Sequence, residues 1–158
     1  MDEVSVTIIR HPKERIRKCS LTPLQKRSDF RFLKASKHFQ FDATGFILLS
    51  LNATVLSKKD AGHPLLLLDS TWRLLPELVR CLTGNPIRRS LPSGIETAYP
   101  RRSKISVDPS GGLASVEALY VALKILGRDD PSLLAEYRWK DLFLSRLAEQ
   151  FNPDNAIS

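Results

Sequence analysis

The stretch LLLLDSTW, residues 65–72, gives the strongest indication of the fold of this chain. Four consecutive leucines follow a turn segment at 61–64 that contains Gly62 and Pro64, and they end at the carboxylate of Asp69. A continuous apolar run of this length, bounded by turn residues, is typical of a parallel strand that is buried on both faces. We therefore expect a central strand over 65–68 that places Asp69 at its carboxyl end, where open α/β sheets bind their ligands.

Strands and helices are expected to alternate along the rest of the chain. Apolar and β-branched runs predict strands, and apolar residues at helical spacing predict helices. The expected strands are Val4–Ile9, Gly45–Leu51 and Ile87–Leu91, and the expected helices lie within Asp69–Gly84, over Leu113–Leu126 and from Asp130 to about Phe151. This alternation predicts an α/β fold, a single domain over 1–158 with a mostly parallel sheet flanked by helices, a C-terminal helix within 128–151 and a tail over 152–158.

The charge of the chain points to a polyanionic partner. The 158 residues carry a formal net charge of +7, and ten Lys or Arg residues lie between Arg10 and Lys37 against two acids. Such an excess favours nucleic acid or an anionic membrane surface, although a merely basic protein with solvated charges is the alternative. Because the cations are spread over loops and strands rather than along one amphipathic helix, we expect RNA and no membrane. The expected phosphate-binding residues are Arg10, Lys13, Arg15, Arg17, Lys18, Arg101 and Arg102.

Several other classes of function lack their usual sequence signals. Cys19 and Cys81 are the only cysteines, and their wide separation predicts neither a zinc site nor a redox pair. The three histidines form no ligand pair at helical spacing, so we expect no metal. The first residues have no signal-peptide pattern and no apolar run is long enough to span a bilayer, so we expect a cytoplasmic protein.

The acid that ends the leucine run is the first candidate for chemistry. Desolvation at the end of a buried strand would raise the pKa of Asp69 and make its carboxylate a competent general base. Trp72 lies three residues later and offers a flat surface on which a base can stack. The alternative is structural, with Asp69 capping the following helix and Trp72 packing in the core.

A glycine pair before the helix expected at 113–126 is the second candidate. Gly111 and Gly112 allow the backbone to approach a ligand closely, and the N–H groups at a helix start favour an anion such as a carboxylate. Many helices begin after glycines, however, and Glu117 in the first turn also has a structural interpretation as a complement to the helix dipole.

Three motifs, in their order along the chain, resemble those of the DTW-domain family. That family is similar in turn to the rRNA aminocarboxypropyltransferases. Residues 11–14, HPKE, match the family's H-P-x-E element, and residues 69–72, DSTW, match its D-x-T-W signature. Residues 112–118, GLASVEA, match its G-x-x-S/T-x-E-A element. Tyr99, Arg101 and Arg102 fit the basic stretch between the last two motifs, and the resemblance covers residues 4–127.

The resemblance implies a knotted fold of the SPOUT class, with S-adenosylmethionine as co-substrate. It implies transfer of the 3-amino-3-carboxypropyl group to a uridine in RNA. From the resemblance we expect tRNA as acceptor, with rRNA as the alternative. This chain lacks the cysteine-rich N-terminus of many tRNA-modifying members, so the choice between the two stays open. We favour a monomer. In this scheme Asp69 and Trp72 are catalytic, and the donor is bound by Ser70, Thr71, Gly111, Gly112, Leu113, Ser115 and Glu117.

Two other functions fit the same sequence. A SPOUT-type RNA methyltransferase would use the same donor but transfer its methyl group, and the mass of the product would distinguish it. A non-enzymatic RNA-binding factor would keep the D-x-T-W element for structural reasons and would bind RNA without the donor.

Overall fold

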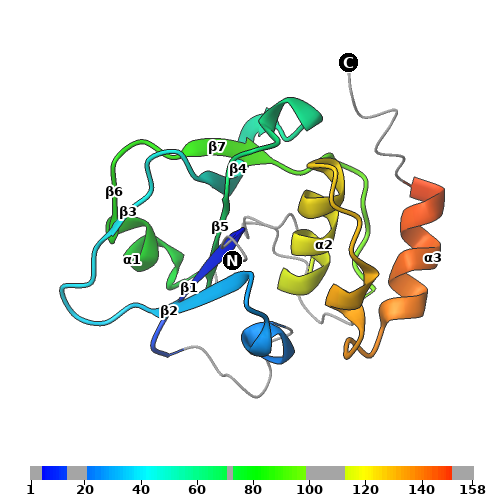
Figure 1. Ribbon diagram of the computed structural model, residues 1–158, viewed down its shortest axis with the longest axis horizontal. Helices are drawn as coiled ribbons and strands as arrows, with labels where there is room; N and C mark the ends of the chain where they lie inside the picture. Colours follow the sequence, from blue (N-terminus) through cyan, green and yellow to red (C-terminus); the bar gives the residue numbers. More distant parts are fainter. Residues whose placement is uncertain (1–4, 14–20, 71–72, 99–112, 151–158) are drawn as a thin grey trace. The chain divides into compact units, whose positions relative to one another are not determined.

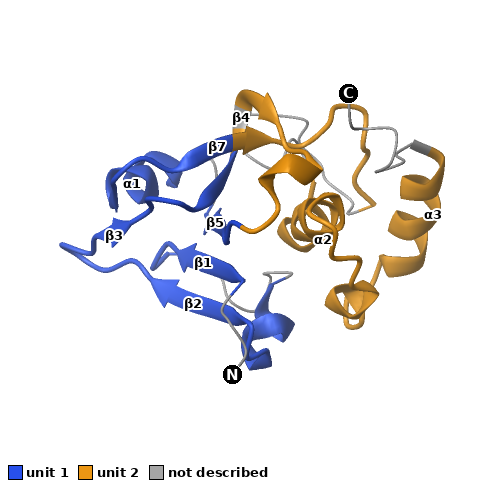
Figure 2. Ribbon diagram, turned by 45° about the horizontal axis from the view of Figure 1, so that its top comes forward, with its two compact units in different colours: residues 1–49, 63–88 blue, residues 50–62, 89–158 orange. Residues whose placement is uncertain are grey.

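The structure is a computed structural model that describes residues 5–13, 21–70, 73–98 and 113–150. The chain divides into two compact units that alternate along the sequence (Figure 2). Unit 1 comprises residues 1–49 and 63–88, and unit 2 comprises residues 50–62 and 89–158. No single cut in the chain separates the two units, because each takes residues from two separate stretches.

Parallel strands form the framework of unit 1 (Figure 1). A five-stranded sheet has the order β2-β1-β5-β4-β7, and its last two strands continue into unit 2. The bounds are β1 Val6–Arg10, β2 Phe30–Lys34, β4 Ile47–Val55, β5 Leu65–Asp69 and β7 Ile87–Ser90. β1 pairs in parallel with β2 on one side and β5 on the other, and β4 pairs in parallel with β5. The predicted α/β class with a mostly parallel sheet is confirmed.

The leucine run forms β5, and every residue of that strand is buried. On one face, Leu66 packs with Leu78 of the helix α1, Leu75–Arg80. On the opposite face, Leu65 and Leu67 are also buried. The run is apolar without interruption because both faces of the strand are covered, and a solvent-facing side would have required alternating polar residues.

β2 was not among the predicted strands. Its sequence, FRFLK, lies inside the basic region and has charged residues at its second and fifth positions. β2 is the last strand on its side of the sheet. Charged side chains are favoured on such edge strands, where they oppose pairing with other chains. Arg31 and Lys34 are exposed whereas Phe30 is buried, so the charges that suit an edge strand also made β2 hard to distinguish from the basic region around it.

The segment after β5 contains a shorter helix than expected. α1 occupies only part of it, and the chain then forms β6, Leu82–Thr83, which pairs in parallel with β3, Phe41–Asp42. Gly84, the last residue of the segment in which the helix was expected, follows β6 instead and has a φ of 76°. A Cβ at this position would lie 2.1 Å from the hydroxyl oxygen of Thr44, so both the backbone conformation and the close approach require glycine.

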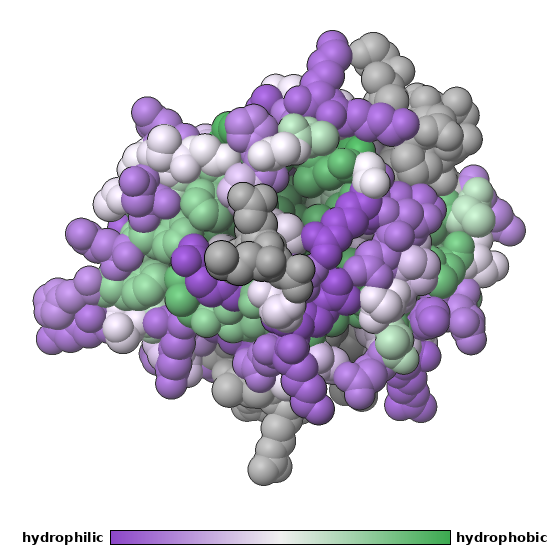
Figure 3. Space-filling view, in the orientation of Figure 1, coloured by the Kyte–Doolittle hydropathy of each residue, from purple (hydrophilic) through white to green (hydrophobic). Residues whose placement is uncertain are grey.

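Partly buried apolar side chains surround the α1 face of the sheet. They come from the segments around β2, β3, α1 and β6: Leu33, Phe39, Phe41, Phe46, Leu75, Val79, Cys81 and Leu82. Two of them, Phe41 and Phe46, pack edge to face with ring centroids 5.2 Å apart. Figure 3 shows hydrophobic side chains between hydrophilic ones on the side where Figure 1 draws α1 and β3. Two backbone hydrogen bonds of 2.8 Å, from Phe41 N–H to the Cys81 carbonyl and from Ala43 N–H to the Thr83 carbonyl, join β3 to β6, and this packing adds to them.

Helices dominate unit 2. α2, Ser115–Ile125, confirms the helix predicted there and is buried along almost its whole length. It is followed by the 3-10 helix η4, Pro131–Leu134, and by α3, Lys140–Gln150. The single C-terminal helix predicted from the sequence is therefore interrupted. After η4 the chain turns so that the Tyr137 hydroxyl donates to the carboxylate of Glu117, at 3.0 Å, before α3 begins.

A second part of unit 2 is held by an acid in the 3-10 helix η3, Lys58–Asp60. The Asp60 carboxylate accepts hydrogen bonds from Arg89 Nε at 3.1 Å and from the backbone N–H of Ser57 at 3.1 Å. This carboxylate links η3 to β7. Within the described part of the chain, no helix has the length and apolar character that crossing a membrane requires.

Candidate functional site

The carboxyl ends of three neighbouring strands meet at one edge of unit 1. The pairing places Arg10, the last residue of β1, level with Lys34 at the end of β2 and with Asp69 at the end of β5. Residues at matched positions of neighbouring strands point to the same face of a sheet. Three charged side chains therefore converge at the edge where sheets of this class bind ligands.

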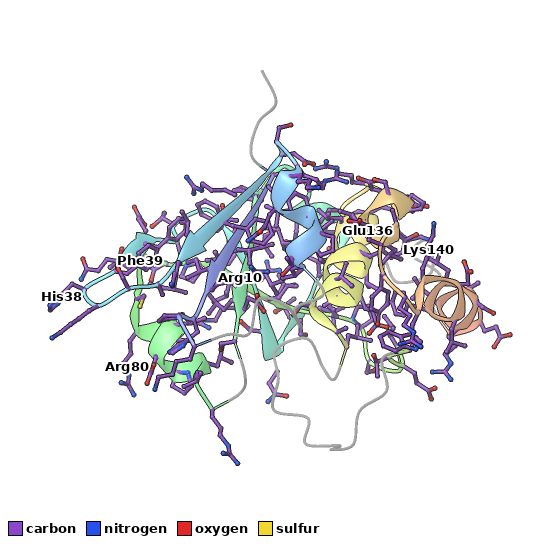
Figure 4. The ribbon with its side chains drawn as sticks, turned by 90° about the horizontal axis from the view of Figure 1, so that it is seen from below. Arg10, His38, Phe39, Arg80, Glu136 and Lys140 are labelled. Atoms are coloured by element: carbon purple, nitrogen blue, oxygen red, sulfur yellow. The ribbon has the colours of Figure 1, made fainter. Side chains whose placement is uncertain are left out.

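Arg10 and Asp69 form a buried ion pair at this edge. Arg10 Nε donates to Asp69 Oδ2 at 2.9 Å, and the two side chains are 7% and 6% exposed. Arg10 Nη2 also donates to Thr22 Oγ1 at 3.2 Å, and the guanidinium carbon lies 5.0 Å from the centre of the Phe32 ring. Figure 4 shows Arg10 among the strands, whereas His38 and Arg80 lie on the outside of unit 1. The cation is thus fixed by contacts on several sides.

This pairing changes the interpretation of both residues. Arg10 was expected on the surface as a phosphate contact, but it is buried and its Nε is directed at a carboxylate of the protein itself. The sequence indicated only that Asp69 is removed from water, whereas the structure shows a cation beside it. Arg10 therefore holds the Asp69 carboxylate in a fixed position at the end of the strand.

A cavity of about 200 Å³ lies beside the ion pair in unit 1. Its walls come from the end of β1, from the 3-10 helix η2, Thr22–Lys26, and from the end of β2. The lining residues are Arg10, His11, Pro12, Gln25, Phe32, Leu33 and Lys34. These seven described residues include two cations and three apolar side chains but no carboxylate. Such a lining suits an anionic ligand that also has an apolar part.

The residue after β1, His11, ties the same edge to α1. The backbone N–H of Lys13 donates to His11 Nδ1 at 3.1 Å, so the other ring nitrogen, Nε2, carries a proton and donates to Glu77 Oε2. His11 is 5% exposed and Glu77 is 56% exposed. This hydrogen bond holds the pKa of Glu77 below its ordinary value. The H-P-x-E element therefore has a structural function through its histidine.

Glu117, in the first turn of α2, is the centre of a hydrogen-bond cluster in unit 2. Its side chain is fully buried. Oε1 accepts from the Thr97 hydroxyl at 2.5 Å and from the Ala114 N–H at 2.8 Å. Oε2 accepts from the Ala98 N–H at 2.9 Å and from the Tyr137 hydroxyl at 3.0 Å. Glu117 was expected to contact the donor directly, but the structure directs its carboxylate to these intramolecular donors.

This cluster holds two distant parts of the chain together. Ala98 and Ala114 stand on either side of residues 99–112, and both donate their backbone N–H to the same carboxylate. The guanidinium of Arg146 on α3 adds a hydrogen bond to the Thr97 carbonyl, at 2.9 Å. Glu117 therefore positions the flanks of the segment that contains the predicted glycine pair.

The structure describes only some of the remaining predicted site residues. Ser70 is half-buried next to Asp69 in unit 1, Leu113 is buried and Ser115 is the first residue of α2 in unit 2, and Lys13 is exposed. The others lie outside the described residues: Arg15, Arg17, Lys18, Thr71, Trp72, Arg101, Arg102, Gly111 and Gly112. Within the described ranges, no three His, Cys, Asp or Glu side chains gather in a way that would hold a metal ion.

Sequence reasoning missed the residues that complete the cavity. Gln25, Phe32 and Lys34 line it, and Thr22 contacts Arg10. All four belong to η2 or β2, which were both absent from the predicted elements. The apolar residues Phe30, Phe32 and Leu33 within the basic region were the signal that could have indicated β2.

The comparison with solved structures identifies the fold. The chain is similar to the SAM-dependent rRNA:acp-transferase Tsr3 from Vulcanisaeta distributa. The TM-score is 0.69 and the identity 24%, and the match covers 92% of this chain and 80% of that one. At this identity the likeness shows a shared fold. Neither the protein-family models nor the curated proteins gave a match to the sequence.

Proposed function

We propose that this protein transfers the 3-amino-3-carboxypropyl group of S-adenosylmethionine to a uridine in RNA, with tRNA as the preferred acceptor and rRNA as the second. Three findings support the proposal: the fold shared with Tsr3, the order of the three motifs, and the net charge of +7. The observation that carries it is the buried pair of Arg10 and Asp69, which places the acid of the D-x-T-W motif at the ligand-binding edge of a parallel sheet. The proposal includes the DTW-domain relationship, a knotted SPOUT-like arrangement, a cytoplasmic location and a monomer.

The described residues fit the donor in part. The backbone N–H groups in the first turn of α2, at Ser115, suit the donor's carboxylate, because the positive end of a helix favours anions. The cavity in unit 1 does not suit the whole donor. Its volume of about 200 Å³ is below the ~300–1,000 Å³ of pockets for complete ligands, and its cations oppose a sulfonium charge. We therefore propose that the donor is held by Ser70, Thr71, Gly111, Gly112, Leu113 and Ser115, and that the cavity serves another part of the reaction.

The proposed chemistry is one substitution at carbon. The sulfonium of the bound donor activates its attached carbons, so uridine N3 forms a bond to the methylene of the aminocarboxypropyl arm as the carbon–sulfur bond breaks and methylthioadenosine leaves. Asp69 accepts the N3 proton, and Arg10 is a positioning residue that orients this carboxylate. Trp72 stacks against the base or shapes the donor site. Because N3 lies on the pairing edge, the target uridine must be unpaired.

The first test is the mass of the product. The purified protein is incubated with S-adenosylmethionine and total RNA, and the digested nucleosides are weighed. We expect a uridine derivative that is heavier by one aminocarboxypropyl group, together with methylthioadenosine. A methylated nucleoside would instead support the methyltransferase alternative, and RNA binding without any new nucleoside would support the binding-factor alternative.

The second test concerns Asp69. Asp69→Asn keeps an oxygen that accepts a hydrogen bond from Arg10 but removes the charge, so we expect loss of transfer with donor binding retained. Asp141→Asn, at an exposed position of α3, is the matched control and should keep full activity. Far-UV circular dichroism checks that both variants are folded. Full activity of a folded Asp69→Asn protein would exclude Asp69 as the proton acceptor.

A further inference from the structure

The cavity beside the ion pair has two chemically different sides. Lys34 and Gln25 are exposed and form a polar rim, whereas Phe32, on the same face of β2 as Lys34, is half-buried and forms an apolar wall. A ligand that fits both sides has a charged end directed to solvent and a less polar ring directed inward. This is the pattern of a nucleotide, in which a phosphate is joined to a ribose and a base.

The size of the cavity limits how much of a ligand it can hold. At about 200 Å³ it corresponds to roughly seven water molecules at ~30 Å³ each. That space is suited to the ribose or the base of one nucleotide, with the phosphate outside at the rim, and it is too small for the complete donor or for several stacked nucleotides. A longer RNA would therefore enter the cavity with a single residue and continue over the surface.

The electrostatics of the lining favours a phosphate at the rim. The charge of Arg10 is opposed by Asp69, to which it is bound, whereas Lys34 has no acid among the other residues that line the cavity. Exposed Lys37, three residues further along the chain, adds a second positive charge close in sequence to Lys34. A positive rim of this kind attracts phosphates over distances of about a Debye length, ~8–10 Å in physiological salt.

We propose that this cavity binds one nucleotide of the acceptor RNA adjacent to the target uridine, with its phosphate at Lys34 and Gln25 and its ribose or base against Phe32. The inference rests on the proposed function in naming RNA as the partner. Arg10 connects the two sites, because it lines the cavity and also holds Asp69. The nucleotide site therefore sets the register of the RNA relative to the carboxylate that accepts the proton.

Binding of a fluorescein-labelled single-stranded oligouridylate, measured by anisotropy at several salt concentrations, tests the proposal. Lys34→Ala removes one phosphate contact, so we expect affinity to fall about tenfold, which is typical of a charged hydrogen bond. The slope of log affinity against log salt should fall by about 0.7, the value for one phosphate on a single strand. Lys59→Ala removes an equal charge from an exposed position of η3 in unit 2 and should leave both quantities nearly unchanged.

A second variant separates the phosphate contact from a general effect of charge. Gln25→Ala removes a neutral side chain from the rim, so we expect weaker binding with an unchanged salt slope. Equal losses for Lys34→Ala and Lys59→Ala would overturn the proposal, because the cation would then act only through net charge. The absence of any oligouridylate binding by the unaltered protein would overturn it as well.

Calorimetric titration with S-adenosylmethionine tests whether the cavity binds the carboxylate of the donor instead of an RNA phosphate. We expect Lys34→Ala to bind the donor as the unaltered protein does. Weaker donor binding with unchanged oligouridylate binding would assign the cavity to the donor's carboxylate and overturn the proposal. The proposed reaction is tested independently of the nucleotide site. If RNA binding depends on Lys34 but no aminocarboxypropyl nucleoside forms, the nucleotide site is supported and the transferase activity is excluded.

Discussion

Two buried acids, Asp69 in unit 1 and Glu117 in unit 2, are stabilised in different ways. Asp69 is bound by a cation, Arg10, at the end of the neighbouring strand. Glu117 is bound by neutral donors, two hydroxyls and two backbone N–H groups. A buried charge is tolerated only when it is paired or fully hydrogen-bonded, and these two acids use one solution each. The sequence singled out both acids as candidate site residues, yet the first lies beside a cavity and the second joins segments of the chain.

The largest effect is expected from removing the cation of unit 1. Arg10→Met keeps much of the side-chain volume but leaves Asp69 buried without its cation, and breaking a buried pair in this way typically costs about 3–5 kcal/mol. Urea unfolding monitored by circular dichroism would measure the loss. Because Asp69→Leu removes the stranded charge, the double variant should recover most of the stability. Failure of the second change to restore stability would show that Arg10 contributes through its other contacts.

A smaller loss is expected from changing the acid of unit 2. In Glu117→Gln the hydroxyls of Thr97 and Tyr137 can rotate to accept from the new amide, whereas one backbone N–H loses its acceptor. An unsatisfied buried group costs about 1–3 kcal/mol, and no second side-chain change can rescue it because the stranded donor is backbone. Glu136→Gln, at an exposed position (Figure 4), is the control and should remain within about 0.5 kcal/mol.

One donor of the Glu117 cluster can be removed alone. Tyr137→Phe deletes the hydroxyl but leaves Glu117 three donors, so we expect a destabilisation of about 1 kcal/mol. Unfolding in urea is again the measurement, with Tyr120→Phe as a comparison that removes a hydroxyl bound to Asp129 instead. A loss as large as that of Glu117→Gln would mean that the tyrosine carries most of the cluster's contribution.

The smallest effect on stability is expected for an exposed acid, Glu77, which serves as a comparison with the two buried acids. Its pKa is lowered chiefly by the hydrogen bond from His11, so this bond contributes stability above the ordinary glutamate pKa of about 4.3. That contribution is lost as the pH falls through the lower pKa of the folded protein. NMR titration of the Glu77 carboxyl should give a midpoint below the ordinary value, and His11→Ala should move it upward. An unchanged midpoint would show that the bond is absent in solution.

The central strands could be predicted because their composition is dictated by burial. The leucine run has no polar position over residues 65–68, and only a strand covered on both faces requires this. β2 could not be separated from the basic region around it, because an edge strand tolerates the charges that also mark a loop. The two-residue strands β3 and β6 are too short to leave any periodicity.

The partners of the two acids could not be predicted, because they depend on which distant segments meet. Arg10 and Asp69 are 59 positions apart, and their contact follows from the register of β1 against β5. The donors to Glu117 come from residues before, within and after α2. The motif sequences identified both acids as important positions, but their chemical partners required the fold.

The placement of β1 between β2 and β5 also has a consequence for synthesis of the chain. All five residues of β1 are buried in the finished fold, yet β5 begins 55 positions after β1 ends, at Leu65. At about 5–20 residues per second, the ribosome takes several seconds to supply that partner. During this interval β2 is the neighbour available to β1, and the other edge of β1 is open to chaperones or to nascent chains nearby. The same strand order that assembles the candidate site thus makes the emerging N-terminal segment the part of the molecule most dependent on protection before folding is complete.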